Sequence, residues 1–458
     1  MSLPESVQVL PTNLSVLLNG LFALLHSGRI DYAVMRNYDG LPDSVGSSDL
    51  DILVEPSQSD DAIRLIRQAI REAGGVPIGI SRTAALVKIC AFGRVSPGGG
   101  RWWGLRIDVN LQLTYCGVGL DVRDILTRFA RTCREIRVLH PGAAALLALV
   151  KELVHNRRIE LEDLEACRRH ARNSWSEFSC ITAPLGRSAA RAMARLVLED
   201  DSAPVSDPEA RRIRSLISRS ALLRCPHRVV AAQIRGTLSK VRRILTPSGK
   251  LVAVLGVDGS GKSSLLEALR QPLEDATHRR LEIRHLRPGL LPPLGRLRGR
   301  SESAGTTPPH ALPPSGTLLS LVRLAWLLAD YILGYWIRVR PSLARQPNVV
   351  LFDRYACDLR IDPGRFRIRL PAFVLRMAVR VVPRPDLVVC LVASPDVVLA
   401  RKTELGAEEI LRQTAALRSL VADTREAVIV DADPPLGEVR DSVLTVLQNL
   451  CRRRSEGS

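Results

Sequence analysis

The chain has 458 residues, a formal net charge of +18, and a composition of 46% hydrophobic and 24% charged residues. This length exceeds what one hydrophobic core supports and indicates about two to four domains, while the hydrophobic content excludes an intrinsically disordered chain. The cationic surplus favours anionic partners, but no block of basic and aromatic residues marks a specific nucleic-acid interface. The nine cysteines form no C-x-x-C pair and no zinc-ligand cluster, which predicts reduced thiols and a cytoplasmic location.

The first part of the chain mixes helical and strand periodicities, and we predict an α+β domain over residues 1–140. Two segments have the apolar spacing of amphipathic helices, at 14–25 and 60–73. Four segments have the apolar character of strands, at 32–35, 50–54, 85–92 and 105–113.

Two carboxylates stand at the start of the strand expected over 50–54. Asp49 and Asp51 are two residues apart, so strand alternation places both side chains on one face. Asp108 supplies a third acid from another strand, and three such acids can hold two Mg²⁺ ions for nucleotidyl transfer. This pattern resembles the nucleotidyltransferase superfamily of DNA polymerase β, and the resemblance implies metal binding at these positions. The Gly-Ser turn that this superfamily has upstream is replaced here by Arg36-Asn37, and turn acids without a metal are the alternative.

The middle of the chain is helical, and we predict a helical connector domain over residues 141–246. Apolar spacing indicates helices within 143–153, 189–198 and 213–223. Pro247-Ser248-Gly249 then interrupts the chain and predicts a boundary to a third domain over 247–458.

An apolar strand over 251–255 leads into a glycine-rich loop and a helical pattern. The order strand, G-x-x-x-x-G-K-S, helix is the context of a phosphate-binding P-loop, so we expect ATP and Mg²⁺ as ligands. In such a loop the lysine, Lys262, reaches the β- and γ-phosphates and the hydroxyl of Ser263 binds Mg²⁺. The expected nucleotide-binding residues are Gly256, Asp258, Gly259, Ser260, Gly261, Lys262, Ser263 and Ser264.

Four further apolar runs alternate with helical stretches, at 281–286, 349–352, 387–392 and 427–430. Strands separated by helices predict a five-stranded parallel sheet covered on both faces. The segment 287–315 is rich in Pro, Gly, Ser and Arg and predicts a long loop.

The segment 318–337 is the most apolar stretch of the chain. Arg323 and Asp330 interrupt it, which favours a packed amphipathic helix over a membrane span. Its tryptophans and tyrosines keep peripheral membrane contact open.

The strand over 349–352 delivers Asp353 and Arg354 at its carboxyl end, where ligands bind in an open α/β sheet. We expect Asp353 to hold Mg²⁺ or orient the acceptor, and Arg354 to clamp an anionic acceptor through two hydrogen bonds.

These motifs together resemble the thymidylate kinase family. The resemblance rests on G-x-D-G-x-G-K-S from Gly256, on Asp353-Arg354-Tyr355, on Pro385-Asp386-Leu387, on Leu399-Ala400-Arg401-Lys402 and on Val430-Asp431-Ala432. It implies transfer of the ATP γ-phosphoryl group, with an arginine that stabilises the developing charge. Because Gly259 occupies the P-loop position of that arginine, Arg401 is the candidate, with Lys402 or Arg412 as substitutes.

The half of the motif set that would bind the acceptor departs from the family. The family's segment after the second strand is represented only by 286–289, and its serine after D-R-Y is replaced by Asp358. We therefore predict a kinase, acting on a nucleoside monophosphate such as dTMP or on a sugar or glycan acceptor, as in related proteins of bacterial surface-polysaccharide gene sets. A nucleotidyltransferase using Asp49, Asp51 and Asp108 and a non-enzymatic nucleotide-gated scaffold are the alternatives. The interpretation allows a homodimer.

Overall fold

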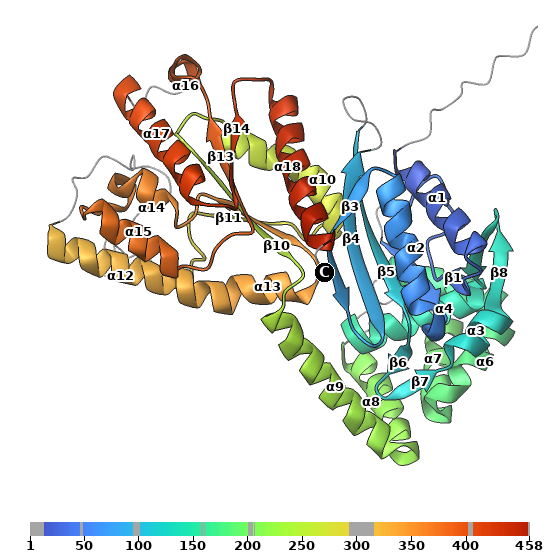
Figure 1. The fold of residues 1–458 in the computed structure, drawn as a ribbon. Coiled ribbons are helices and arrows are strands. Elements are labelled where there is room, and N and C mark those ends of the chain that lie inside the picture. The colour runs from blue at the N-terminus through green and yellow to red at the C-terminus, as the bar shows by residue number, and fades with distance from the viewer. Residues whose placement is uncertain are drawn as a thin grey trace, which may run out of the picture. The chain divides into compact units, whose positions relative to one another are not determined.

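The computed structural model describes residues 13–45, 49–94, 101–156, 159, 161–199, 205, 207–292, 316–401 and 406–456. The chain divides into two compact units, one made of residues 1–75, 80–89 and 93–242 and the other of residues 243–458 with the short pieces 76–79 and 90–92 (Figure 1). The expected loop lies mostly in 293–315, outside the described residues, as do Gly46-Ser47-Ser48 and Lys402.

The first unit is built on a seven-stranded mixed sheet in the order β3-β4-β5-β2-β1-β9-β8. Its sheet region contains α1 (Asn13–Ser27), β1 (Tyr32–Val34), β2 (Leu50–Val54), η1 (Pro56–Gln58), α2 (Ser59–Glu72), β3 (Gly75–Arg82), β4 (Leu86–Arg94), β5 (Trp102–Asn110), β6 (Leu113–Tyr115), β7 (Val118–Leu120), α3 (Val122–Phe129), β8 (Ala130–Cys133) and β9 (Ile136–Leu139). The strand at 75–82 was not expected from the sequence. Its Gly75, Pro77 and Gly79 are residues that strands usually avoid.

The helices after β9 belong to the same unit as the sheet. They are α4 (Pro141–Lys151), η2 (Glu152–Asn156), α5 (Leu161–Asn173), α6 (Trp175–Thr182), η3 (Ala183–Leu185), α7 (Arg187–Leu198), α8 (Asp207–Arg224) and α9 (Pro226–Leu245). One hydrophobic cluster joins Ala33 and Leu53 of the sheet to Leu146, Phe178 and Ile217 of these helices. The residues expected to form a separate connector domain therefore share a core with the N-terminal sheet.

The second unit has a five-stranded sheet in the order β11-β12-β10-β13-β14, in which every neighbouring pair is parallel. The predicted parallel sheet is therefore confirmed. The elements are β10 (Lys250–Gly256), α10 (Lys262–Thr277), β11 (Glu282–His285), α12 (Thr317–Gly334), η4 (Tyr335–Val339), α13 (Arg340–Arg345), β12 (Val349–Asp353), α14 (Asp358–Ile361), η5 (Pro363–Phe366), α15 (Ala372–Val381), β13 (Leu387–Val392), α16 (Pro395–Arg401), α17 (Ala407–Asp423), β14 (Ala427–Asp431) and α18 (Leu436–Glu456).

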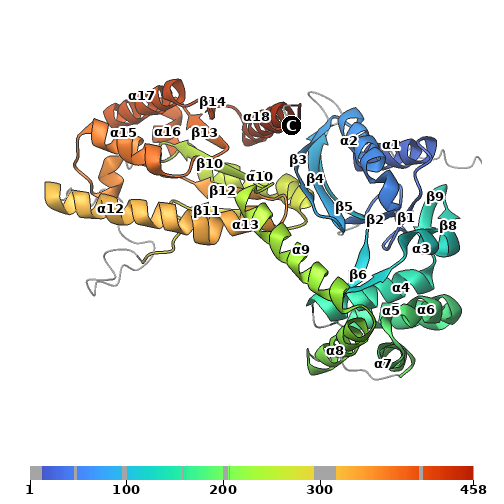
Figure 2. The same ribbon diagram turned by 60° about the horizontal axis from the view of Figure 1, so that its bottom comes forward.

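Helices cover both faces of this sheet. α10 and α18 pack together on one face, and α17 covers the other with α14 and α15 beside it (Figure 1). α12 runs alongside α15 (Figures 1 and 2). The strands are apolar along almost their whole length because both faces are buried, as in β13, where Leu387 through Leu391 are all buried.

Among the described residues, one helix, Thr317–Arg345, is long and apolar enough to cross a membrane by length and composition, and 33% of its most apolar window is buried. Its buried side includes Leu324, Leu327 and Tyr331. Asp330 is fully buried and accepts hydrogen bonds from the backbone N–H groups of Gly289 and Leu291. This carboxylate explains the charged interruption in the apolar stretch, since it secures the segment that follows β11.

Candidate functional site

The loop between β10 and α10 has a geometry that depends on glycine. Gly259 and Gly261 have φ of +93° and +88°, in the left-handed region that glycine adopts at little cost. A Cβ atom on Gly256 would lie 2.6 Å from Ser260 Oγ and 3.0 Å from a backbone carbonyl oxygen of β13. Because α10 begins at Lys262, its unpaired N–H groups and the positive end of its dipole face the loop. The loop can therefore bind phosphate oxygens.

Hydroxyl groups line this loop. Ser260 Oγ is buried and has no hydrogen-bond partner among the described residues, so its O–H can donate to a phosphate oxygen. Ser263 and Ser264, in the first turn of α10, are exposed and available to a metal ion or a nucleotide.

Lys262 is buried inside the loop, with 7% of its side chain exposed. Its Nζ donates to the carbonyl oxygen of Val257 at 2.8 Å and lies 3.7 Å from Asp258 Oδ1. Burial and the nearby Arg354 guanidinium lower the pKa of Lys262 to about 8, although Asp258, Asp353 and Asp358 act in the opposite direction.

Asp258 connects the loop to the segment after β12. Its two carboxylate oxygens accept hydrogen bonds from Arg354 and Arg365. Arg354 also donates to both oxygens of Asp358 at 3.0 Å and is only 2% exposed. Burial alone would raise the pKa of Asp258. The nearby Arg354, Lys262 and Arg365 outweigh this effect and lower the pKa to about 2. The guanidinium expected to clamp an acceptor is therefore held between two aspartates, and its plane is fixed beside the loop.

Asp353 ends β12 next to the loop, since its register partner on β10 is Val254, two residues before Gly256. One oxygen, Oδ2, lies 3.1 Å from Nδ1 of the exposed His285. The other, Oδ1, is buried without a hydrogen-bond partner among the described residues. Burial raises the pKa of Asp353, but His285, Lys262 and Arg354 outweigh it and lower the pKa. An ionised carboxylate with one free oxygen fits a hard cation such as Mg²⁺.

Of the three cations expected near the γ-phosphate, Arg401 is the one that the structure places at the loop. Its Nη1 lies 3.6 Å from the position that a Cβ atom on Gly261 would occupy. Arg412 is instead paired with Glu409 and donates to the carbonyl oxygen of Ile361 at 3.1 Å. Lys402 lies outside the described residues.

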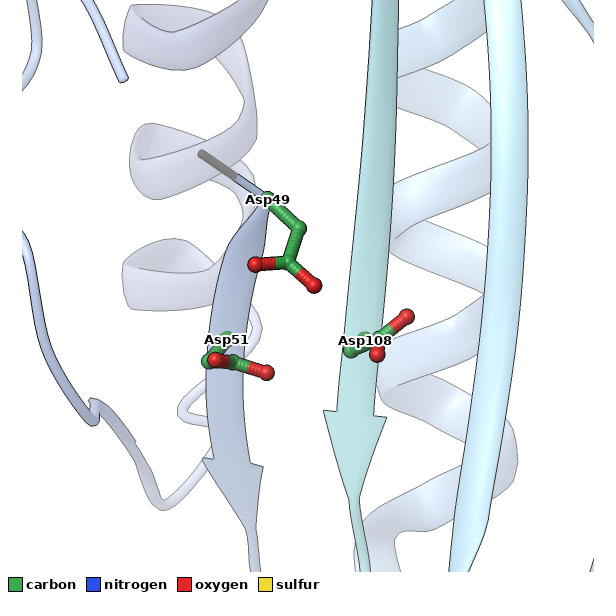
Figure 3. A group of neighbouring side chains, drawn as sticks. All are labelled: Asp49, Asp51 and Asp108. Atoms are coloured by element: carbon green, nitrogen blue, oxygen red, sulfur yellow. The ribbon is translucent and has the colours of Figure 1, made fainter. Parts of the chain in front are cut away.

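The three aspartates singled out in the N-terminal sequence lie together in the first unit. Asp51 on β2 is the direct register partner of Asp108 on β5, and the two strands are parallel. Asp49 precedes β2 on the same side (Figure 3). One ligand oxygen from each residue lies within 4.8 Å of the others, and all three side chains are buried.

Basic side chains neutralise these aspartates. Arg36 contacts Asp51 at 2.5 Å and Asp49 at 3.2 Å, Arg106 pairs with Asp108 and lies 3.3 Å from Asp49, and Lys151 lies 3.6 Å from Asp51. Burial lowers the pKa of Arg36, but Asp51 and Asp49 together outweigh it and raise the pKa. A cavity of about 450 Å³ lies beside Asp51 and Asp108. The cluster could hold a metal ion only if these cations moved away.

Several of these partners were not identified from the sequence. Arg106 could have been found, because it lies two residues before Asp108 on one strand and so shares its face. Arg36 and Arg365 lie 13 and 107 residues from the aspartates that they contact. No local pattern marks pairs this distant, and only the tertiary fold brings them together.

No family model matches the chain. A thymidylate kinase from Symbiobacterium thermophilum is 27% identical over 216 residues, which cover 44% of this chain and 94% of the relative. A thymidylate kinase from Xanthomonas campestris pv. campestris is 34% identical over 158 residues, or 34% of this chain, and the chain spans 62% of that relative's length.

A solved structure, thymidylate kinase from Ehrlichia chaffeensis, covers 44% of this chain and 100% of its own, with a TM-score of 0.33 and 16% identity. At that TM-score it adds nothing to the fold described above. Thymidylate kinase homology therefore extends over 34–44% of this chain.

Proposed function

We propose that the protein is a kinase that transfers the γ-phosphoryl group of ATP to a phosphorylated acceptor, in the manner of a thymidylate kinase. The observation that carries this proposal is the loop after β10, where Lys262 is buried among glycines with Asp353 and Arg401 beside it. The homology to thymidylate kinases supports a nucleotide kinase.

The loop provides the contacts that phosphoryl transfer needs. Lys262 Nζ already donates to the Val257 carbonyl oxygen, so an incoming phosphate exchanges that partner for a charged one. As the γ-phosphoryl group migrates, its oxygens carry charge that Lys262 can follow, and Arg401 approaches from the side of Gly261.

Asp353 and Ser263 are the residues that would hold Mg²⁺, since a carboxylate oxygen without a partner and an exposed hydroxyl are oxygen ligands of the kind this ion prefers. When bound, Mg²⁺ neutralises charge on the phosphates. His285 orients Asp353 through its hydrogen bond to Oδ2.

The acceptor is the finer part of the proposal. Arg354 and Arg365 are paired with Asp258 beside the loop, so an anionic acceptor could bind them only by displacing that carboxylate. We infer a nucleoside monophosphate such as dTMP, because the relatives are thymidylate kinases. A sugar phosphate or glycan phosphate is the competing acceptor, since the sequence departs from the family on the acceptor side.

Transfer from ATP labelled at the γ- or the α-phosphorus, with dTMP, other nucleoside monophosphates and sugar phosphates as acceptors, tests both parts. We expect γ-label in a phosphorylated nucleotide product. γ-Label in a sugar product only would keep the kinase and replace the acceptor, whereas no γ-transfer to any acceptor would contradict the kinase.

A second candidate, nucleotidyl transfer by the first unit, is favoured by the convergence of Asp49, Asp51 and Asp108. It requires divalent metal and product carrying α-label. Under the kinase proposal, Asp49→Asn with Asp51→Asn leaves γ-transfer per folded molecule unchanged. Loss of all transfer with ATP binding retained would favour the second candidate.

A further inference from the structure

A cavity of about 630 Å³ lies in the second unit, away from the phosphate-binding loop. Its walls include the residues just before β13 and just before β14, hence the amino ends of two parallel strands, whereas the loop follows the carboxyl end of β10. The C-terminal part of α15 and the segment Tyr355–Cys357 complete it. This volume is in the range of small-molecule sites, which is roughly 300–1,000 Å³.

Arginine dominates the charged lining of this cavity. Five arginines meet there from α14, α15 and two loops, against the carboxylates of Asp423 and Glu426; they are Arg360, Arg376, Arg380, Arg384 and Arg425. Arg360 is paired with Asp423. Arg376, Arg384 and Arg425 have no ion-pair partner in the part of the chain that the structure describes. The cavity therefore carries a positive charge that the protein itself leaves unneutralised.

The backbone holds several of these arginines in fixed positions. Arg376 and Arg380 are four residues apart on α15, so they project from one side of the helix. Arg384 lies between Pro383 and Pro385, whose rings restrict the backbone on both sides. The Pro383 carbonyl oxygen accepts a hydrogen bond from Tyr355 Oη at 2.8 Å, and Asp386 accepts one from the backbone N–H of Leu251. The backbone that carries these arginines is therefore fixed by contacts of its own.

We propose that this arginine-lined cavity binds a multiply phosphorylated ligand at a second site, separate from the loop that holds ATP. Guanidinium groups form paired, charge-assisted hydrogen bonds with phosphate oxygens, and several of them around one cavity select for more than one phosphate. The same chemistry is offered by a soluble polyphosphorylated compound and by the headgroup of an anionic lipid. The exposed Phe373 and Met377 on α15 would suit the lipid source.

Calorimetric titration of the full chain with tripolyphosphate tests the site. Arg380→Glu with Arg384→Glu removes two cations from the cavity, and Arg418→Glu, exposed on α17 outside its lining, is the matched control for charge. Lys262→Ala separates the cavity from the loop. Besides the event at the loop, we expect a second binding event that survives Lys262→Ala and Arg418→Glu but weakens about 100-fold in the double variant, since each lost pair contributes roughly tenfold in affinity.

The event should also weaken as salt increases. If the double charge reversal prevents folding, as judged by circular dichroism, Arg384→Gln is used, with an expected weakening of about tenfold. Flotation with phosphatidylcholine vesicles containing phosphatidic acid distinguishes the sources. Vesicle binding lost in the cavity variant assigns a lipid headgroup, and tripolyphosphate binding alone assigns a soluble ligand. Absence of any event independent of Lys262, or equal loss in Arg418→Glu, would overturn the proposal.

Discussion

Two clusters of aspartates, one in each unit, differ in how far their charges are satisfied by the protein itself. In the first unit, Asp49, Asp51 and Asp108 are matched by Arg36, Arg106 and Lys151. In the second unit, Asp258 is likewise paired, but Asp353 keeps a buried oxygen without a partner.

The backbone next to the aspartates also differs between the two units. Left-handed glycines in the second unit shape the turn into α10, whose first N–H groups have no partner within the helix. The first unit has no such loop among the described residues next to its aspartates. The comparison teaches that clusters of carboxylates differ in how much hydrogen-bonding capacity the protein leaves for a ligand, even where their spacing alone would suit a metal ion.

The largest expected effect is that of Lys262→Ala. Loss of the only lysine in the loop should slow γ-phosphoryl transfer by about 3–4 kcal/mol, or roughly 100- to 1,000-fold, without unfolding the protein. Turnover at saturating ATP measures this, with the melting temperature as the folding control. Near-normal turnover in the folded variant would contradict the assignment of γ-phosphoryl transfer to the loop of the second unit.

The second expected effect concerns the first unit. Arg106 and Asp108 are both almost completely buried, so Arg106→Ala should cost about 3 kcal/mol of unfolding free energy at neutral pH by leaving carboxylates unpaired. Urea denaturation measures the loss. In Arg36→Ala with Arg106→Ala, Mn²⁺ should restore part of the stability, whereas the unmodified protein gains none at this cluster. If Mn²⁺ stabilised the unmodified protein and this stabilisation were lost in Asp51→Asn, the cluster would already be open to metal.

Asp353→Asn should have a smaller effect. The amide keeps the shape but not the charge, so the Mg²⁺ concentration required for half-maximal turnover should rise about tenfold or more, while ATP binding without metal changes little. Glu267→Gln on the exposed side of α10 is the control. Equal changes in both measurements would indicate that Asp353 has a structural role.

The smallest expected effect is a pH dependence. Folding lowers the pKa of Lys262 from its ordinary value to about 8, so the ammonium form that binds phosphate is present below pH 8 and is lost above it. The affinity for ATP should be constant below this pH and fall by up to about tenfold per unit above it. A profile measured on Lys262→Ala should be flat across this range, and an equal decline in that variant would assign the titration to another group.

The sequence predicted those parts of the molecule whose structure follows from neighbouring residues along the chain. The strands of the second unit and the loop after Gly256 follow from apolar runs and glycine spacing. The proximity of Asp51 and Asp108 could be predicted for a similar reason, since strand alternation fixes the face on which each side chain lies. The ion pairs formed by Arg36 and Arg365 were not accessible, because contacts between residues distant in sequence depend on the packing of whole elements. The alternation signal also failed for β3, where Pro77 and two glycines break it.

Asp330 determines the rotation of α12 about its own axis. Each residue turns a helix by about 100°, so a carboxylate bound to the amides of Gly289 and Leu291 leaves little freedom in which side of α12 faces the segment after β11. Leu318, Val322 and Leu333 consequently face outward, with 78%, 51% and 49% of their surfaces exposed. Insertion of a single residue between Val322 and Asp330 would turn Leu318 and Val322 by about 100° around the helix, while Leu333 and the anchor stay in place. The position of this exposed hydrophobic surface is thus set by one buried charge.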